Sequence, residues 1–528
     1  MLGLVLVVVL GAAVLVCDLA GRHLHIATPV LLLVAGTLLG FLPGLSEVRL
    51  PPETMLLLFL PALLYWESLT TSPREIRRDL RGIVLMSTLL VLATAAAVAT
   101  AAHALGLPWG PAWVLGAAVA PTDATAVGVL AGALPRRNIT QLRAESLVND
   151  GTALVVHGLA IGITIGQENL APGHVTGLFL LAYAGGVAAG ALTAWVAVRV
   201  RRHLDDPLQE SAAIILIPFT AFLLAESAHA SGVLAVVVCG LSMSQAGPRV
   251  GLPGTRRQTE EFWSLAIFLL NGSLFVLVGL EAQAAARNLT SDDLVHALAI
   301  VLVACATLAA VRFAFLFGVI DLMYAVDRHP RRRTRRVSPR ARVVAGVAGF
   351  RGAVSLAAAL AVPHALDSGA PFPHRDVIVF VTSGVVVVTV VAQGLLLPPV
   401  IRWARLPRDT AVEEELRLAR ETALREALAA LPEVAGGLGS DPEVVERLRR
   451  EYRTHLALIA AHDGDGDEEP AVRRDRHYTA LGLALLRRKR ATMIRLRDEG
   501  RIDDTVLRTL QTMLDAEEVR LLRHQSTD

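Results

Sequence analysis

The sequence predicts an all-α polytopic membrane protein with about thirteen transmembrane helices, followed by a small helical domain. Hydrophobic residues make up 53% of the 528 residues and charged residues only 19%, with a mean hydropathy of +0.52. Soluble chains usually carry about 25% charged residues. Apolar runs fill residues 1–400, whereas residues 409–528 are as charged as an ordinary soluble segment. This pattern excludes a disordered chain, a soluble α/β enzyme and, with three isolated cysteines, a disulfide scaffold.

The helix count rests on the length of the apolar runs, because a membrane-spanning helix needs about 20 mostly apolar residues. Such runs lie at 2–20, 25–43, 54–71, 82–105, 110–132, 141–166, 175–200, 210–229, 231–246, 260–283, 293–324, 342–363 and 376–403. The first run begins at Met1 with no basic segment before it and no convincing cleavage site after it. We therefore expect a retained helix and not a signal peptide.

Arginines alternate between the gaps that separate these runs. The odd-numbered gaps hold 22 arginines, and the even-numbered gaps hold only Arg49, Arg287 and Arg375. Cytoplasmic loops collect basic residues. The alternation predicts a multi-pass protein of the plasma membrane with its N-terminus outside and its C-terminus in the cytoplasm. It also favours thirteen spans, because a miscounted span would put every later gap out of phase.

Ionisable residues inside spans are costly, so they are candidates for function. Asp123, Asp150 and Arg312 have long apolar stretches on both sides. Four other residues lie nearer span ends, where their side chains are expected to reach water: His103, Glu226, His229 and Glu281.

Two spans contain helix-breaking segments, Ala120-Pro121-Thr122-Asp123 in span 5 and Gly349-Phe350-Arg351-Gly352 in span 12. Proline removes a backbone donor, and broken backbone survives at membrane depth only inside protein or beside water. The breaks fall in the fifth span of spans 1–6 and the fifth of spans 8–13. This match predicts two inverted six-helix repeats with interrupted crossing helices. Because helix ends carry partial charges, we expect Asp123 and Arg351 to compensate them. Arg351 is then mainly structural, whereas Asp123 has a structural role and is also a candidate ligand.

Span 6 carries a candidate cation site. Ser146 and Asp150 are four residues apart and share a helix face, with Asn149 beside them. Oxygen ligands suit hard cations, so sodium fits, and magnesium stays open on ligand type alone. Glu145 points elsewhere and needs a buried counter-ion, for which Arg312 is the natural choice.

Desolvation favours the protonated form of a buried carboxyl group. Such a group can hold a proton or a metal cation but not both, so a body with alternating access would exchange one for the other. The sequence contains no phosphate loop, nucleophile elbow or metalloprotease motif. We therefore expect a transporter and not an enzyme, with a hard cation and H⁺ as its cargo and no cofactor.

Six motifs in order give the chain a family resemblance. They are Phe59-Leu60-Pro61 running to Tyr65-Trp66-Glu67-Ser68, Ala120-Pro121-Thr122-Asp123, Glu145-Ser146-Leu147-Val148-Asn149-Asp150-Gly151, Ser231-Gly232-Val233-Leu234-Ala235-Val236, Asn271-Gly272-Ser273-Leu274-Phe275-Val276-Leu277-Val278-Gly279-Leu280 and Phe350-Arg351-Gly352-Ala353-Val354-Ser355-Leu356. Over most of residues 50–403 the chain resembles the monovalent cation:proton antiporters, of the bacterial sodium/proton type related to the animal sodium/proton exchangers.

The resemblance implies that Asp150 carries the cation or the proton, with Asn149 before it in place of a second aspartate. An Asn-Asp pair in this family goes with electroneutral one-for-one exchange. The resemblance also implies that Na⁺ is held by Asp150, Asp123, Thr122, Ser146 and Glu67, that Glu145 pairs with Arg312, and that the protein is a homodimer. Two departures from the family pattern are Ala124, where proline is usual, and the long arginine-rich segment 325–342.

Residues 1–408 are expected to form the transporter domain and residues 409–528 a cytoplasmic helical domain with a regulatory or dimer-supporting role. Leucines at helical spacing predict a first helix broken at Pro432 and Gly436-Gly437, and further helices at about 441–462, 476–499 and 503–524. The acidic segment 463–469 is read as a solvated linker. The basic loops suit anionic lipid headgroups, and no nucleic-acid partner is expected.

The leading hypothesis is a sodium/proton antiporter that serves pH homeostasis. The alternative within this class is a potassium/proton exchanger or one with broad selectivity for monovalent cations. A symporter for an organic solute and a membrane-bound sensor are the alternatives outside it.

Overall fold

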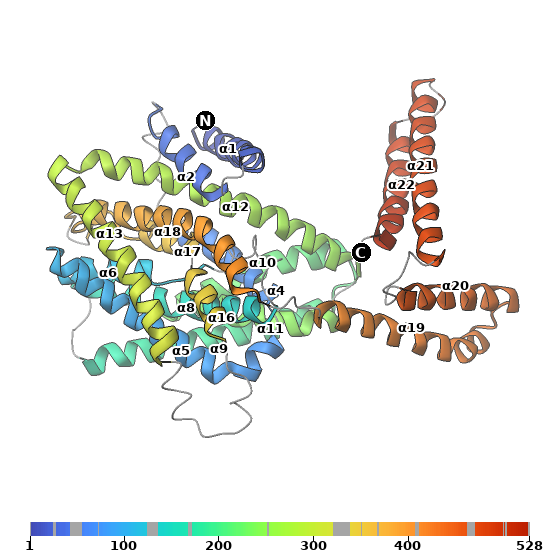
Figure 1. The fold of residues 1–528 in the computed structure, drawn as a ribbon, viewed down its shortest axis with the longest axis horizontal. Coiled ribbons are helices and arrows are strands. Elements are labelled where there is room, and N and C mark those ends of the chain that lie inside the picture. Colours follow the sequence, from blue (N-terminus) through green and yellow to red (C-terminus); the bar gives the residue numbers. More distant parts are fainter. Residues whose placement is uncertain are drawn as a thin grey trace. The chain divides into compact units, whose positions relative to one another are not determined.

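The computed structural model describes residues 2–24, 28–42, 55–71, 73–123, 136–166, 172–250, 253–319, 338–349, 351–366, 369–406, 411–461, 470–499, 501 and 504–525. The chain divides into two compact units, Met1–Arg408 and Asp409–Asp528. Helices account for nearly all of both units (Figure 1), and the described ranges contain no β-strand beyond an isolated bridge between Ala365 and Pro371. The predicted all-α class is confirmed.

The first unit is built from helices in the order that the apolar runs predict. They are α1 (Leu2–Leu24), α2 (Thr28–Leu39), the π-helical turn η1 (Met55–Phe59), α4 (Leu60–Thr70), α5 (Pro73–Ala104), α6 (Trp109–Val119), α8 (Arg136–Thr164), α9 (Pro172–Arg201), α10 (Pro207–Ser227), α11 (Gly232–Val250), α12 (Pro253–Asn288), α13 (Ser291–Ala314), the π-helical turn η3 (Phe315–Val319), α16 (Pro339–Val347), α17 (Ala353–Leu360) and α18 (Arg375–Ala404).

Every predicted span coincides with at least one of these helices. Among the described residues, eight helices are long and apolar enough to cross a membrane, and four shorter apolar helices accompany them. The total of thirteen stays a prediction, because 124–135 and 320–337 lie outside the described residues.

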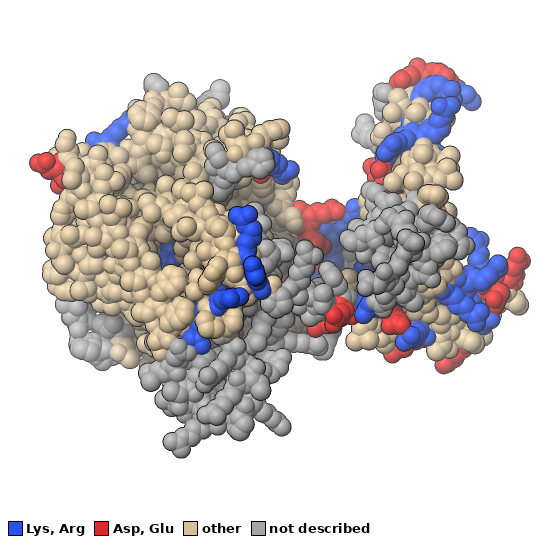
Figure 2. All heavy atoms as spheres, viewed as in Figure 1, with Lys and Arg blue, Asp and Glu red and all other residues tan. Residues whose placement is uncertain are grey.

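The outer surface of the first unit is apolar, as a lipid-facing surface must be. Trp195, Leu302 and Leu395 are 67%, 66% and 72% exposed. On the face drawn in Figure 2, uncharged side chains predominate over this unit, with a few basic and acidic groups, whereas acidic and basic side chains are more frequent over the second unit.

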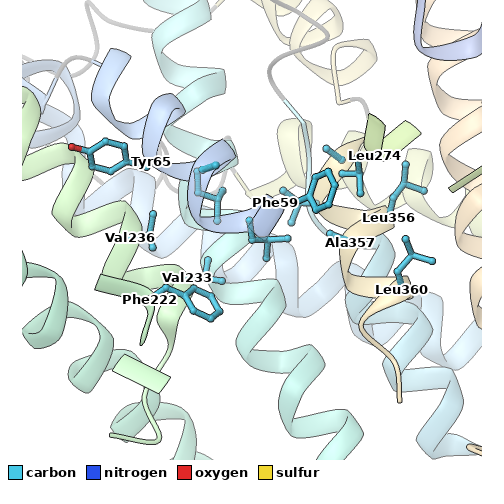
Figure 3. Close-up of a cluster of buried hydrophobic side chains, with 14 of the residues drawn as sticks. Phe59, Tyr65, Phe222, Val233, Val236, Leu274, Leu356, Ala357 and Leu360 are labelled. Carbon is cyan, nitrogen blue, oxygen red and sulfur yellow. The ribbon is translucent and has the colours of Figure 1, made fainter. Parts of the chain in front are cut away.

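Two large hydrophobic cores lie inside the first unit. The first is formed mainly by α1, α2, α4, α9, α10, α11, α12 and α17, and Figure 3 shows part of it, including Phe59, Leu274 and Leu356. The second is formed mainly by α5, α6, α13 and α18. α8 contributes Leu147 to the first core and Ala160 to the second, so the helix that carries Asp150 contacts both.

Close helix contacts in the first core depend on glycine. A Cβ atom on Gly279 of α12 would lie 2.2 Å from the Leu33 carbonyl oxygen of α2, and one on Gly36 would lie 2.0 Å from the Val276 carbonyl oxygen. Small residues let membrane helices approach at backbone distance, where van der Waals packing is strongest.

The second unit contains α19 (Ala411–Leu438), α20 (Pro442–Ala461), α21 (Pro470–Asp498) and α22 (Asp504–Gln525). α19 packs on α20, and α21 packs on α22. The expected break in the first of these helices is wrong, because α19 continues through Pro432 and ends at Leu438. Pro432 is exposed, so water can satisfy the carbonyl that loses its helical donor, and the helix ends before Gly439, whose φ is +61°.

Candidate functional site

The site is built on the two predicted helix breaks, and both breaks are present. α6 ends at Val119, and the following segment, Ala120 to Asp123, is not helical. At the break predicted in span 12, α16 ends at Val347 and α17 begins at Ala353. Ala124 and Phe350, which the sequence also places at the breaks, lie outside the described residues.

Two charged side chains tie the breaks together. Arg351, which precedes α17, donates from Nε to the Val119 carbonyl at the end of α6 (3.1 Å) and from an η nitrogen to the Gly349 carbonyl (2.7 Å). Asp123, which follows α6, accepts a hydrogen bond from the Ala353 backbone N–H at the start of α17 (3.3 Å). The positively charged Arg351 side chain therefore lies at the C-terminus of α6, and the negatively charged Asp123 side chain lies at the N-terminus of α17. These are the ends at which the helix dipoles favour each charge.

The contact between the two breaks leaves no room for a side chain on Gly352. A Cβ atom there would lie 1.8 Å from Asp123 Oδ2. Glycine is therefore required at this position by the approach of the Asp123 carboxylate to the α17 backbone.

α8 supplies the middle of the site. Ser146 Oγ donates to the Thr122 carbonyl (2.7 Å), and the Asn149 amide lies 2.9 Å from Thr122 Oγ1. With its oxygen turned toward that hydroxyl, Asn149 can also donate to the carbonyls of Ser87 and Glu145, each at 3.2 Å. The broken backbone of span 5 is thus held to α8 by two side chains, and Asn149 is saturated by these contacts.

Asp150 differs from Asn149 because one of its side-chain oxygens has no hydrogen-bond partner among the described residues. Its side chain is 2% exposed, and Oδ1 is buried without a hydrogen-bond partner among the described residues. The same holds for Oε1 of Glu67 on α4. Glu67 interacts electrostatically with Asp123 and lies beside Ser146, and Asp150 interacts electrostatically with both Glu67 and Asp123.

The structure therefore brings together the residues that the sequence and the family resemblance single out. They are Glu67, Thr122, Asp123, Ser146, Asn149 and Asp150. Within the described ranges, no three His, Cys, Asp or Glu side chains are arranged to hold a metal ion by themselves. A cation here would be bound by carboxylate oxygens together with hydroxyl or carbonyl oxygens, which is a ligand set for a hard cation.

Glu145 and Arg312 lie in contact behind this site. An η nitrogen of Arg312 donates to Glu145 Oε1 (2.8 Å), while Nε and the other η nitrogen donate to the Ala345 carbonyl of α16 (3.2 and 3.0 Å). Arg312 is 4% exposed. The pair joins α8 to α13, and the bonds to Ala345 extend the connection to the helix that precedes the second break.

Two features of the first unit were not foreseen. Arg201 and Glu210 form a second buried ion pair, with Nε and an η nitrogen of Arg201 donating to one carboxylate oxygen at 2.8 and 2.6 Å. Arg143 interacts electrostatically with Glu67. All three residues lie near span ends, where sequence alone assigns charged side chains to loops. The signal that could have found Arg143 is its helical spacing from Asp150.

Comparisons with known proteins show the family to which the chain belongs. The model of the family described as "Sodium/hydrogen exchanger, transmembrane" matches residues 6–403. A Mycobacterium tuberculosis protein named as an uncharacterized Na(+)/H(+) exchanger is 46% identical over 522 residues, which is 98% of this chain and 96% of that protein.

Two further matches are more distant. The Na(+)/H(+) antiporter ApNhaP of Aphanothece halophytica is 29% identical over 81% of this chain and 79% of its own length. The solved structure of the sodium proton antiporter MjNhaP1 from Methanocaldococcus jannaschii has the same fold, with a TM-score of 0.57 at 20% identity; the match covers 77% of this chain and all of that one. This chain belongs to the sodium/hydrogen exchanger family of membrane transporters.

Proposed function

We propose that this protein exchanges Na⁺ for H⁺ across the plasma membrane by alternating access, and that the two ions compete for Asp150. The observation that carries the proposal is the Asp150 carboxyl itself: it is buried, it interacts electrostatically with Glu67 and Asp123, and one of its oxygens lacks a hydrogen-bond partner among the described residues. A buried carboxylate is unstable without a counter-charge, so it binds either a proton or a cation.

The family and the names of the relatives favour Na⁺ over the K⁺ alternative. The ligand types suit either alkali cation, since carboxylate, hydroxyl and carbonyl oxygens are hard donors. In this proposal Thr122, Asp123, Ser146 and Glu67 complete the cation site, Asn149 holds α8 to the span 5 break, and no cofactor is needed.

One carboxyl that carries one ion at a time gives one-for-one, electroneutral exchange. Moving a net charge through the membrane costs about 2.3 kcal/mol per 100 mV. A one-for-one exchanger avoids this term, so an imposed membrane voltage should leave the flux unchanged. A clear voltage dependence in proteoliposomes would contradict this stoichiometry.

The replacement Asp150→Asn tests the proposal directly. It keeps the size of the side chain and removes the titratable group, so Na⁺-driven proton flux in proteoliposomes should vanish while the protein still inserts. Asp18→Asn is a matched control, because Asp18 pairs with Arg22 within α1, away from the site. Exchange by Asp150→Asn at the rate of the control would refute the proposal. A panel of alkali cations in the same assay measures the preference for Na⁺.

The arrangement in the cell is part of the same proposal. The arginine alternation supports an N-terminus outside and a C-terminus inside, and the family resemblance supports a homodimer surrounded by lipid. Residues 1–408 would carry out exchange, and the helical unit 409–528 would regulate it in the cytoplasm. In support of this division, the family match ends at residue 403. A chain ending at Arg408 should still exchange ions, with an altered pH dependence.

A further inference from the structure

Among the described residues, neither Glu67 nor Asp150 is bonded to an arginine or a lysine. Glu67, Asp123 and Asp150 interact with one another electrostatically. The two buried arginines nearby are already bonded elsewhere, Arg312 to Glu145 and Ala345, and Arg351 to the carbonyls of Val119 and Gly349. Like charges repel one another, so a site without a bound cation favours any positive charge that can approach.

Arg143 is placed to supply that charge. It lies on α8, seven residues before Asp150 and three before Ser146. At 3.6 residues and about 5.4 Å per turn, Arg143 stands on the Asp150 face of α8, about 10 Å along the helix axis. α4 packs against α8, and Glu67 of α4 interacts electrostatically with Arg143.

Arg143 and Glu67 attract each other electrostatically, but among the described residues no ion pair or hydrogen bond joins them. Among the described residues, Glu67 Oε1 is buried with no hydrogen-bond partner, in contrast to the carboxylates of Glu145 and Glu210. Arg143 itself is half-buried, whereas Ser146 and Asp150 are fully buried. A long arginine side chain at this depth can lean toward the carboxylate or withdraw toward solvent.

We propose that Arg143 sets the affinity of the cation site: its guanidinium competes with the transported cation for Glu67 and so weakens cation binding. The proposal rests on the proposed function, because it assumes that Glu67 and Asp150 bind the cation. When the site holds no cation, Arg143 offsets the charge of Glu67. When a cation enters, it must displace the Arg143 guanidinium from Glu67. The apparent affinity of the site for the cation is therefore lower than it would be without Arg143.

The test is the KM for Na⁺ of Arg143→Gln in proteoliposomes, at an alkaline pH where protons do not compete. Removing a unit charge from the half-buried position of Arg143, near the site, should lower the KM by about three- to tenfold. Arg143→Lys keeps the charge and should stay within about twofold of the wild-type KM. Arg202→Gln is the matched control, since Arg202 is exposed just beyond the end of α9, and its KM should not change.

A purely structural role predicts the opposite sign, because a damaged site binds the cation more weakly. An unchanged or raised KM in Arg143→Gln would therefore overturn the proposal, and so would an equal drop in Arg202→Gln. If Arg143→Gln does not insert, Arg143→Met is measured with the same expectation. In a Glu67→Gln background, where the competition has no target, Arg143→Gln should change the KM by less than about twofold. Absence of Na⁺-driven flux in the wild-type protein would refute the proposed function instead.

Discussion

The first unit contains two buried Arg–Glu pairs that differ in what they connect. Arg312 and Glu145 lie 167 positions apart, and Arg312 also bonds to the Ala345 carbonyl, beside the span 12 break. Arg201 and Glu210 lie nine positions apart and join the end of α9 to the start of α10. The first pair therefore supports the broken helices of the site, whereas the second fastens two neighbouring helices.

The difference teaches that burial of an ion pair does not by itself mark a functional residue. Desolvation offsets most of the attraction in any buried pair, so what such a pair does for the protein depends on what else its partners bind. Arg312 is a positioning residue because its remaining donors bind the backbone of α16. Arg201 reaches the site only indirectly, through its electrostatic interaction with Tyr65, which stands two residues before Glu67.

The largest effect is expected for Arg312→Ala. It leaves Glu145, whose side chain is 17% exposed, without its counter-ion and removes the donors of the Ala345 carbonyl. Breaking a fully buried pair costs about 3–5 kcal/mol, which is the upper bound here. Yield, thermal stability in detergent and exchange should all fall, and Glu145→Gln in the same chain should recover part of the stability. A stable, active Arg312→Ala protein would show that the Arg312–Glu145 pair does not support the site, and the contrast with the Arg201–Glu210 pair would be lost.

Gly352→Ala should damage exchange without touching either pair. The added methyl group would overlap the Asp123 carboxylate and force the two breaks apart, so the exchange rate should fall at least about tenfold. Gly158→Ala is the matched control, because a Cβ on Gly158 of α8 meets nothing within 4 Å. It should keep its activity and gain about 0.5–1 kcal/mol in stability. Equal rates for the two variants would show that the contact of the breaks is not needed.

A smaller effect on transport is expected when the Arg201–Glu210 ion pair is replaced. Arg201→Ala should lower thermal stability, because Glu210 is fully buried, yet each inserted molecule should exchange within about threefold of the wild-type rate. Replacing both residues together, by Arg201→Met and Glu210→Leu, should restore most of the stability, since buried pairs can be replaced by apolar residues of similar volume. Loss of exchange in the stable double variant would mean that this pair, too, positions the site.

Part of this arrangement could be predicted from the sequence. Spans, breaks and the Glu145–Arg312 partnership follow from apolar length, from proline and glycine at membrane depth, and from the cost of unpaired charge. Sequence could place Asp123 and Arg351 only beside their own breaks. That each reaches the other helix depends on how the repeats pack, which no local pattern encodes. Arg143, Arg201 and Glu210 were missed because residues near helix ends can face either water or protein.

The most direct test of the central claim, competition of Na⁺ and H⁺ for one carboxyl group, is the KM for Na⁺ measured as a function of pH. As the pH falls, protons occupy Asp150, and the KM should rise by up to about tenfold per pH unit while the rate at saturating Na⁺ stays constant. A KM that does not change with pH, with acid lowering only the maximal rate, would contradict competition at a single group.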